Sequence, residues 1–146
     1  MKFIKKVSTP QFFTQDTNGL TDWSQYRSKK RKLKEFILSK KQYFLCCYCE
    51  KKVTVDKESS HLEHIKPKAK SQYPNLTFDY NNLLVSCEGN HFNEIGDNSK
   101  TSCGHKKDNF FDENKFLNPT LIIDIASFFI FDVDDGTISS SLKEID

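Results

Sequence analysis

The sequence predicts a single α+β domain with short strands, and three observations lead to this expectation. A basic segment from about residue 22 to residue 43 carries apolar residues at helical spacing. Two short segments are expected to be β-strands: residues 61–65, which stop before Pro67, and the apolar run at residues 83–86. Cysteines flank both segments in a chain of 146 residues that is only 36% hydrophobic, so an additional cross-link would help to stabilise the core.

The N-terminal part, about residues 1–45, is expected to become helical in its second half. Residues 1–24 carry scattered aromatics with Pro10 and Gly19 and are expected to be irregular. The basic run at residues 27–34 suits either nucleic-acid phosphate or a solvated helix face. The helix predicted from Asp22 to Tyr43 has an apolar stripe formed by Trp23, Tyr26, Leu33, Phe36, Ile37 and Phe44.

The central part, about residues 46–112, carries most of the cysteines and histidines. The first strand, at 61–65, stops before Pro67, because proline has no N–H to donate to a strand ladder. A loop leads from there into the second strand, which ends at a cysteine. A polar stretch at 88–102 follows, and residues 103–111 are expected to form a short helix.

The tail, about residues 117–142, is predicted to form a β-hairpin. Apolar strands are expected at 121–125 and 128–133, and Asp135-Gly136 is a hairpin turn signal. Both faces of the second of these strands are apolar. The tail must therefore be covered by a second copy, by another protein, or by the N-terminal aromatics Phe3, Phe12, Phe13 and Trp23.

The cysteine count and the N-terminus predict a cytoplasmic protein. Five cysteines are an odd number, and the first residues lack the apolar region of a signal peptide. No apolar run is long enough to span a bilayer, so no membrane partner is expected. In the cytoplasm paired cysteines bind metal more often than they form disulfides.

A structural Zn²⁺ is the expected cross-link. Cys46-x-x-Cys49 places two thiolates at zinc-ligand spacing, and the thioredoxin-like context that a redox motif needs is absent. Cys87 and Cys103 supply the second pair across the polar insertion, with His91 as a possible substitute ligand. Cys47 is expected to be a spare buried thiol. The alternative is that all of these are buried apolar cysteines.

A second set of side chains has the chemistry of phosphodiester hydrolysis, which needs a general base and a cation beside the phosphate. His64 suits the base, since a neutral imidazole titrates near the working pH. On a helix that starts near residue 103, His105 and Asn109 would share one face. With Glu63 they would offer ligands to a catalytic Mg²⁺ or Mn²⁺.

The remaining polar residues of this region receive supporting roles. Asn82 is expected to fix the loop that presents His64 through side-chain hydrogen bonds to the backbone. Lys68, Lys106 or Lys107 would steady the phosphate, although each could equally be a solvated lysine. His61 is expected to be structural, with support of a metal ligand as the alternative.

The order of these residues resembles the HNH endonuclease family. The resemblance rests on three segments: Glu63-His64-Ile65-Lys66-Pro67, Asn82-Leu83-Leu84, and Cys103-Gly104-His105-Lys106-Lys107. It implies a single HNH nuclease domain over residues 1–146. Its zinc-stapled ββα-metal (His-Me finger) core would carry an N-terminal helix and a C-terminal hairpin. It also implies His64, Asn82 and His105 as the catalytic residues.

The sequences of these motifs are similar to those of one branch of that family, the HNH nuclease of Septu-type and retron-linked antiphage systems. This resemblance implies an antiviral defence role and an ABC-type ATPase as the protein partner, with DNA or RNA as the substrate. Members of this branch continue beyond such a hairpin, so a C-terminal region is expected to be absent here. The alternative function is a non-catalytic zinc module that binds nucleic acid or protein.

Overall fold

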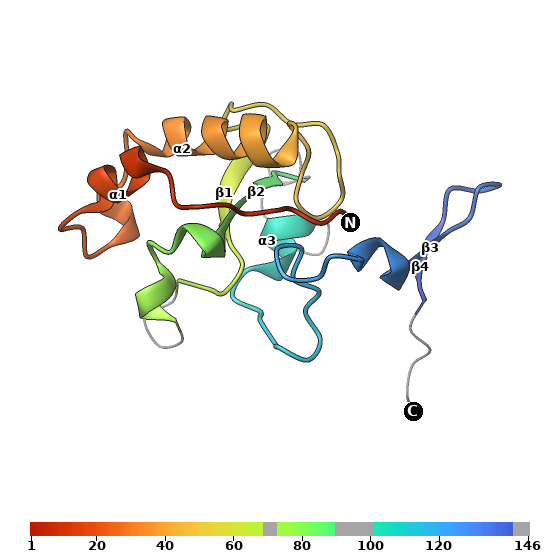
Figure 1. Ribbon diagram of the computed structural model, residues 1–146. Helices are drawn as coiled ribbons and strands as arrows, with labels where there is room; N and C mark the ends of the chain where they lie inside the picture. The colour runs from red at the N-terminus through yellow and green to blue at the C-terminus, as the bar shows by residue number, and fades with distance from the viewer. Residues whose placement is uncertain (69–72, 90–100, 142–146) are drawn as a thin grey trace.

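A two-stranded antiparallel sheet lies at the centre of the computed structural model, which describes residues 1–68, 73–89 and 101–141 (Figure 1). Strand β1 is Ser60–His64 and strand β2 is Leu83–Cys87, close to the predicted ranges. The register pairs Leu62 with Val85 and Glu63 with Leu84. Every residue of β2 is buried, so both faces of the sheet must be covered. The chain is a mixed helix and sheet protein, as the sequence predicts.

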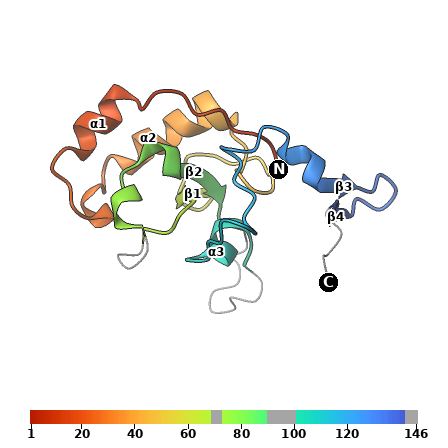
Figure 2. The same ribbon diagram turned by 60° about the horizontal axis from the view of Figure 1, so that its bottom comes forward.

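Two helices cover the two faces of the sheet. Helix α2 (Lys30–Ile37) packs on one face and helix α3 (Cys103–Lys107) on the other, and the layers are clear in Figures 1 and 2. Because successive strand residues point to opposite faces, Leu62 joins the core under α2 while His61 and Glu63 face α3. The alternation of β1 therefore separates an apolar face from a polar one.

The helix predicted over residues 22–43 is wrong in its first half. A 3₁₀ turn, Trp23–Gln25, closes at the start, because the Asp22 carboxylate accepts the N–H of Ser24 in a capping box. After α2 a π-helical turn, Leu38–Gln42, continues the same apolar stripe, which buries Leu33, Ile37 and Leu38. The helix ends at Tyr43 and Phe44, whose φ angles of 52° and 58° lie in the left-handed region.

Helix α1 (Gln11–Thr17) occupies a stretch that the sequence analysis expects to be irregular. It starts directly after Pro10, whose fixed φ suits a helix start. Phe13 on this helix is buried with its ring perpendicular to Tyr26 and tilted against Tyr80, with ring centroids 5.6 and 6.2 Å away. The N-terminal aromatics therefore belong to the main core.

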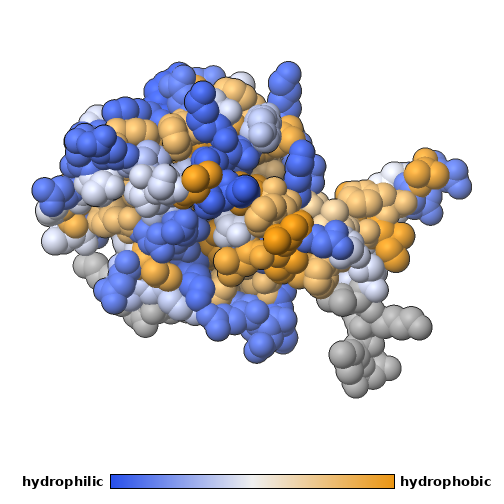
Figure 3. Space-filling model, in the orientation of Figure 1, coloured by the Kyte–Doolittle hydropathy of each residue, from blue (hydrophilic) through white to orange (hydrophobic). Residues whose placement is uncertain are grey.

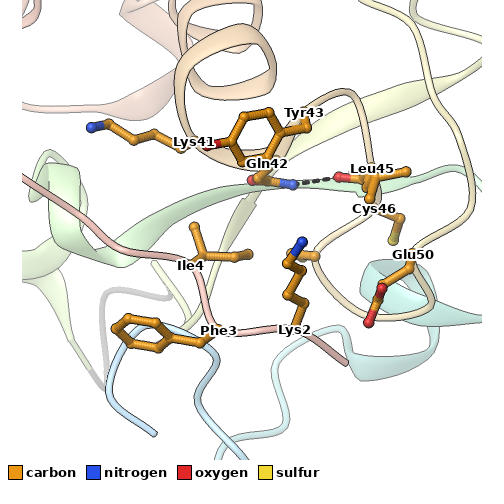
Figure 4. A pocket seen from close by; sticks show the side chains of 10 residues that line it. Lys2, Phe3, Ile4, Lys41, Gln42, Tyr43, Leu45, Cys46 and Glu50 are labelled. Carbon is orange, nitrogen blue, oxygen red and sulfur yellow. Dashed lines mark hydrogen bonds between the residues drawn. The ribbon is translucent and has the colours of Figure 1, made fainter. Parts of the chain in front are cut away.

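The first residues form an extended segment that crosses the molecule. The Ile4 N–H donates to Pro119 O at 2.7 Å, and the Lys6 ammonium donates to Leu83 O and Tyr80 O. A hollow of about 30 Å³ lies between this segment and the cysteine turn, and Figure 4 shows the Gln42 amide donating to Leu45 O beside it. It holds about one water molecule and is too small for a substrate.

The tail forms the predicted hairpin but not the first predicted strand. Residues 121–124 form no strand, and a 3₁₀ turn, Ile125–Phe128, follows them. Strands β3 (Phe129–Phe131) and β4 (Ile138–Ser140) pair across a turn in which Gly136 has a φ of 75°. The hairpin projects from the body of the molecule, and apolar residues gather along it (Figures 1 and 3). The outer part of the hairpin is left exposed, so the N-terminal aromatics do not bury Ile130, Phe131 or Ile138.

The exposure of this hairpin is large for apolar side chains: Ile130 55%, Phe131 56%, Ile138 61% and Val133 93%. Within residues 1–68, 73–89 and 101–141, no helix combines the length and the apolar character that a membrane span requires.

Candidate functional site

Four cysteines come together at one end of the central sheet. The sulfur atoms of Cys46, Cys49, Cys87 and Cys103 lie within 4.8 Å of one another, and those of Cys49 and Cys87 are 3.8 Å apart. A tetrahedral zinc ion with Zn–S bonds of about 2.3 Å has sulfur atoms about 3.8 Å apart. The cluster therefore fits a zinc ion and could hold one, as the sequence analysis expects. His91 lies outside the described residues.

The backbone around the cluster explains why these sulfurs meet. The turn after Cys46 closes through Cys46 N–H to Lys51 O at 2.9 Å and Glu50 N–H to Cys46 O at 3.1 Å. The Cys87 N–H donates to the Cys46 sulfur at 3.2 Å. Cys103 begins α3 with a φ of 53°, a left-handed conformation that costs about 1 kcal/mol or more and persists where surrounding contacts impose it.

The thiols of this region differ in their proton affinity. Hydrogen bonds with Cys103, Cys47 and Cys87 hold the pKa of Cys46 far below its usual value, which favours negative charge within the cluster. Burial holds the pKa of Cys47 well above its usual value. Cys47 packs with Ile4, Ile65 and Leu84 in a separate apolar cluster. It is therefore a protonated core residue, as expected.

His64 lies at the end of β1, almost fully buried. Its Nε2 lies 3.0 Å from Thr77 O, and its ring packs edge-on against Trp23 at 4.6 Å. A carbonyl oxygen only accepts, so Nε2 carries the hydrogen and Nδ1 keeps its lone pair. Burial lowers the pKa of His64 to about 4, so the ring is neutral at pH 7. This geometry offers a proton acceptor at Nδ1.

Asn82 connects the segment after His64 to the start of β2. Its Oδ1 accepts the Lys66 N–H at 2.7 Å, and its Nδ2 donates to Lys66 O at 2.9 Å and to Leu76 O at 3.1 Å. The Asn82 backbone also accepts the Ile65 N–H at 2.9 Å. These are side-chain bonds to the backbone of the kind that the sequence analysis expects.

Glu63 faces α3 and is surrounded by polar partners. Its Oε1 accepts from the Tyr48 hydroxyl at 3.0 Å and from the Lys107 ammonium at 3.1 Å, while Oε2 lies 3.5 Å from His61 Nε2. Burial by itself would raise the pKa of Glu63, but His61 and the Lys107 ammonium outweigh it, and the net shift is downward. Glu63 is therefore ionised at neutral pH.

Lys107 does not fit the expected phosphate contact. Its ammonium is buried between Glu63 and the His64 carbonyl, to which it donates at 3.0 Å. Lys106 borders a shallow apolar hollow beside Phe110 and Phe116 instead. Of the three lysines considered from the sequence, Lys68 is the one that lines a groove next to His64, together with Thr77 and Trp23.

Three other side chains form a cluster that the sequence analysis did not predict. His61 Nδ1 lies 2.9 Å from Glu88 Oε1, and His105 Nε2 lies 2.5 Å from Glu88 Oε2. Burial would lower the pKa of His61, but Glu63 and Glu88 raise it to about 9. The available signal was the position of Glu88, which directly follows Cys87 at the end of β2.

The expected partnership of His105 with Asn109 on one helix is wrong. Helix α3 ends at Lys107, and Asp108 has a φ of 45° that no α-helix continues through. His105 remains on α3 and joins the new cluster. Asn109 instead lines the groove beside Trp23, Lys30 and Lys68.

Comparisons with known proteins bear on this arrangement. No family model matches the chain. A curated relative, the "Retron Vc95 putative HNH endonuclease" of Vibrio cholerae serotype O1 biovar El Tor, is 46% identical over 78 residues. The match supports an HNH endonuclease family. It covers 52% of this chain and 32% of the relative, so the chain spans about a third of the relative's length.

An HNH endonuclease acts on nucleic acid, and a basic surface lies next to the candidate site. Two grooves adjoin there and share Trp23 and Lys30. One reaches His61 and Glu88, and the other runs beside Thr77, which contacts His64. We call them together the basic groove, because six cationic residues line it against four acidic ones, Asp22, Asp56, Glu58 and Glu88. The cationic residues are Arg27, Lys30, Arg31, Lys34, Lys57 and Lys68. This groove has the charge to attract a polyanion.

Proposed function

We propose that the chain is a divalent-metal-dependent HNH endonuclease that hydrolyses phosphodiester bonds in nucleic acid. In this proposal β1, β2 and α3 form the ββα-metal core, and the four cysteines hold a structural Zn²⁺. One observation carries the proposal above the others. A neutral imidazole, held at Nε2 by Thr77 O, lies at a strand end next to the basic groove and directly after the buried carboxylate of Glu63.

The roles of the residues follow from their positions. His64 accepts the proton of the attacking water at Nδ1, while its Nε2–H donates to Thr77 O and keeps the ring oriented. Asn82 keeps the backbone beyond His64 in place. Glu63 and His105 border the place of a Mg²⁺ or Mn²⁺ ion. When bound, the ion supplies positive charge for the phosphate and the leaving oxygen.

A wider biological role is part of the same proposal. The relative is named after a retron, and the motif sequences resemble those of the nuclease of antiphage systems. We propose a defence effector that works with an ABC-type ATPase, for which the exposed hairpin provides an apolar contact surface. The alternative is a non-catalytic zinc module. It does not explain the ionised carboxylate of Glu63 near a basic groove, because a carboxylate repels phosphate.

The deciding experiment is a cleavage assay on plasmid DNA, single-stranded DNA and RNA with Mg²⁺ or Mn²⁺. The wild type and His64→Ala are compared, alone and with the native ATPase. Loss of the general base is expected to reduce cleavage by about 10²–10⁴-fold. Zinc content and melting temperature serve as the folding control. Cleavage by a folded, zinc-loaded His64→Ala at the wild-type rate would remove His64 from the reaction, and no cleavage by the wild type of any substrate would favour the binding module.

A further inference from the structure

The cluster of His61, Glu88 and His105 joins three elements at one point. His61 belongs to β1, Glu88 directly follows β2, and His105 lies on α3. The Glu88 carboxylate lies between the two imidazoles, whose ring centroids are 4.6 Å apart. One ligand atom from each residue lies within 4.8 Å of the other two. Residues far apart in sequence thus converge on a shared polar centre.

The distances suit coordination of a metal ion. Ligand atoms about 2.1 Å from an ion lie about 3.0 Å apart in octahedral and about 3.4 Å apart in tetrahedral geometry. The two imidazole–carboxylate distances here are 2.9 and 2.5 Å, so the side chains need to separate by less than about 1 Å to admit an ion. His61 and Glu88 also line the basic groove, so an ion can reach them from solvent. The cluster is separate from the four cysteines, whose sulfur atoms form a group of their own.

The ligand types favour a particular class of ion. Imidazole nitrogens suit zinc, copper, iron and nickel, the carboxylate also suits manganese, and Mg²⁺ prefers ligand sets made of oxygen. Two histidines and one carboxylate leave further positions open for water or substrate. Glu63 differs from Glu88 in the nitrogen that it approaches: its Oε2 lies 3.5 Å from His61 Nε2, whereas Glu88 lies at Nδ1. A carboxylate in that position orients a ligating histidine and fixes its tautomer.

We propose that His61, Glu88 and His105 bind one divalent transition-metal ion, and that Glu63 orients His61 without itself being a ligand. The proposal revises the ligand set expected from the sequence, which was Glu63, His105 and Asn109. It rests on the proposed function only for the catalytic role of the ion. Binding of the metal stands or fails independently of cleavage.

The test measures Mn²⁺ binding by the full chain after weakly held metal has been removed with mild chelator. Free Mn²⁺ is followed by electron paramagnetic resonance, with Mg²⁺ as a competitor, and retained zinc is measured in the same sample. The wild type is expected to bind one Mn²⁺ per chain, with Mg²⁺ at least about 10-fold weaker. Binding of no Mn²⁺ would mean that hydrogen bonds alone hold the cluster together, and would overturn the proposal.

The variants distinguish a ligand from an orienting residue. Loss of an orienting carboxylate weakens metal binding by about 10–100-fold, so Glu63→Gln is expected in that range and Glu88→Gln beyond it. Glu35→Gln, an exposed glutamate on α2, is the matched control and is expected to bind as the wild type does. A larger loss in Glu63→Gln than in Glu88→Gln would make Glu63 the ligand and overturn the assignment.

A second pair of variants keeps the test informative if Glu88→Gln does not fold. His105→Ala removes a partly exposed ligand and is expected to abolish Mn²⁺ binding while zinc is retained. In Gly104→Ala the new Cβ would lie 2.5 Å from His61 Nε2 and 2.8 Å from Glu63 Oε2, so these side chains must shift and Mn²⁺ binding must weaken. Wild-type Mn²⁺ affinity in folded His105→Ala would contradict the proposal.

The cleavage assay separates this inference from the proposed function. If Mn²⁺ binding depends on the three residues but no nucleic acid is cleaved, the metal-site proposal is supported and the nuclease proposal is rejected. If cleavage depends on His64 but Mn²⁺ binding is unchanged in Glu88→Gln, the nuclease proposal is supported and this ligand set is rejected.

Discussion

At the scale of single residues, the candidate site depends on side chains that form hydrogen bonds with backbone N–H and carbonyl groups. Asn82 satisfies both the N–H and the carbonyl of Lys66, and it also reaches the carbonyl of Leu76. One amide therefore replaces the ladder bonds that are missing where β1 ends. A primary amide has both donors and an acceptor, and a carboxylate or an apolar group cannot replace it.

Replacing Asn82 tests this role. Asn82→Ala leaves the Lys66 N–H without its acceptor, so we expect a loss of about 1–3 kcal/mol in the free energy of unfolding and slower cleavage. Urea denaturation and the cleavage assay provide the two measurements. Asn81→Ala, at the exposed neighbouring position, is the control and should change neither. Equal stability of the two variants would show that the amide does not hold the loop.

Lys6 links stability to pH. Burial, with a smaller effect of Lys41, lowers the pKa of Lys6 to about 7 from about 10.5. Between these values the unfolded chain binds a proton that the folded chain does not, so this residue makes stability increase as pH rises from about 7 to about 10. Below pH 7 both states are protonated and the contribution is constant.

The measurement compares denaturation curves of the wild type and Lys6→Met across this range. We expect the difference in unfolding free energy between them to change with pH above 7 and to stay level below it. Subtracting the two unfolding free energies cancels the contribution of ionisable groups that both proteins share. A difference that is independent of pH from 6 to 10 would show that Lys6 stays charged in the folded state.

At the scale of elements, the cysteine cluster joins the turn before β1, the end of β2 and the start of α3. The sheet has only two strands, and α3 has only five residues. Elements this short are not stable by themselves in water. In our proposal the zinc ion fixes their relative positions.

Replacing a cluster cysteine is expected to unfold the protein. Cys49→Ser removes one of four thiolates, and structural zinc supplies much of the folding free energy of small domains. We expect insoluble or unfolded protein without zinc, measured by metal analysis and circular dichroism. Cys47→Ala, two residues away, is the matched control and should retain one zinc per chain. Soluble, folded Cys49→Ser with no bound zinc would contradict a structural role for the metal.

Local patterns in the sequence predict some of these elements and not others. The strands could be predicted because alternation and Pro67 depend on neighbours along the chain. The length of α3 could not, since Asp108 adopts a left-handed φ that its residue type only permits. The pairing of His61 with Glu88 depends on the β1–β2 register and on the approach of Gly104, which tertiary contacts determine.

At the scale of the whole molecule, the hairpin of β3 and β4 stands apart from the layered body (Figure 1). The apolar core lies around α2 and the sheet, and Phe13 and Tyr26 belong to it. Ile130 and Phe131 are more than half exposed. Exposed apolar surfaces of this kind are typical of protein contact sites.

The partner proposal is tested by co-purification with the native ATPase. The double variant Ile130→Asp, Phe131→Asp should keep its zinc and its melting temperature, because these side chains contact little of the core. It should recover much less ATPase than the wild type does. Equal recovery would remove the hairpin from the interface, and no recovery with either protein would remove the partnership.

The contact between Trp23 and His64 has a practical consequence. Trp23 is the only tryptophan in the chain, and it lies in the basic groove with the Lys30 ammonium 5.2 Å from its ring. Indole emission depends on the polarity and charge around the ring. The protein therefore carries an intrinsic fluorophore at the proposed substrate groove, and titration with unlabelled oligonucleotides can be followed by its emission in the His64→Ala variant, where binding occurs without cleavage.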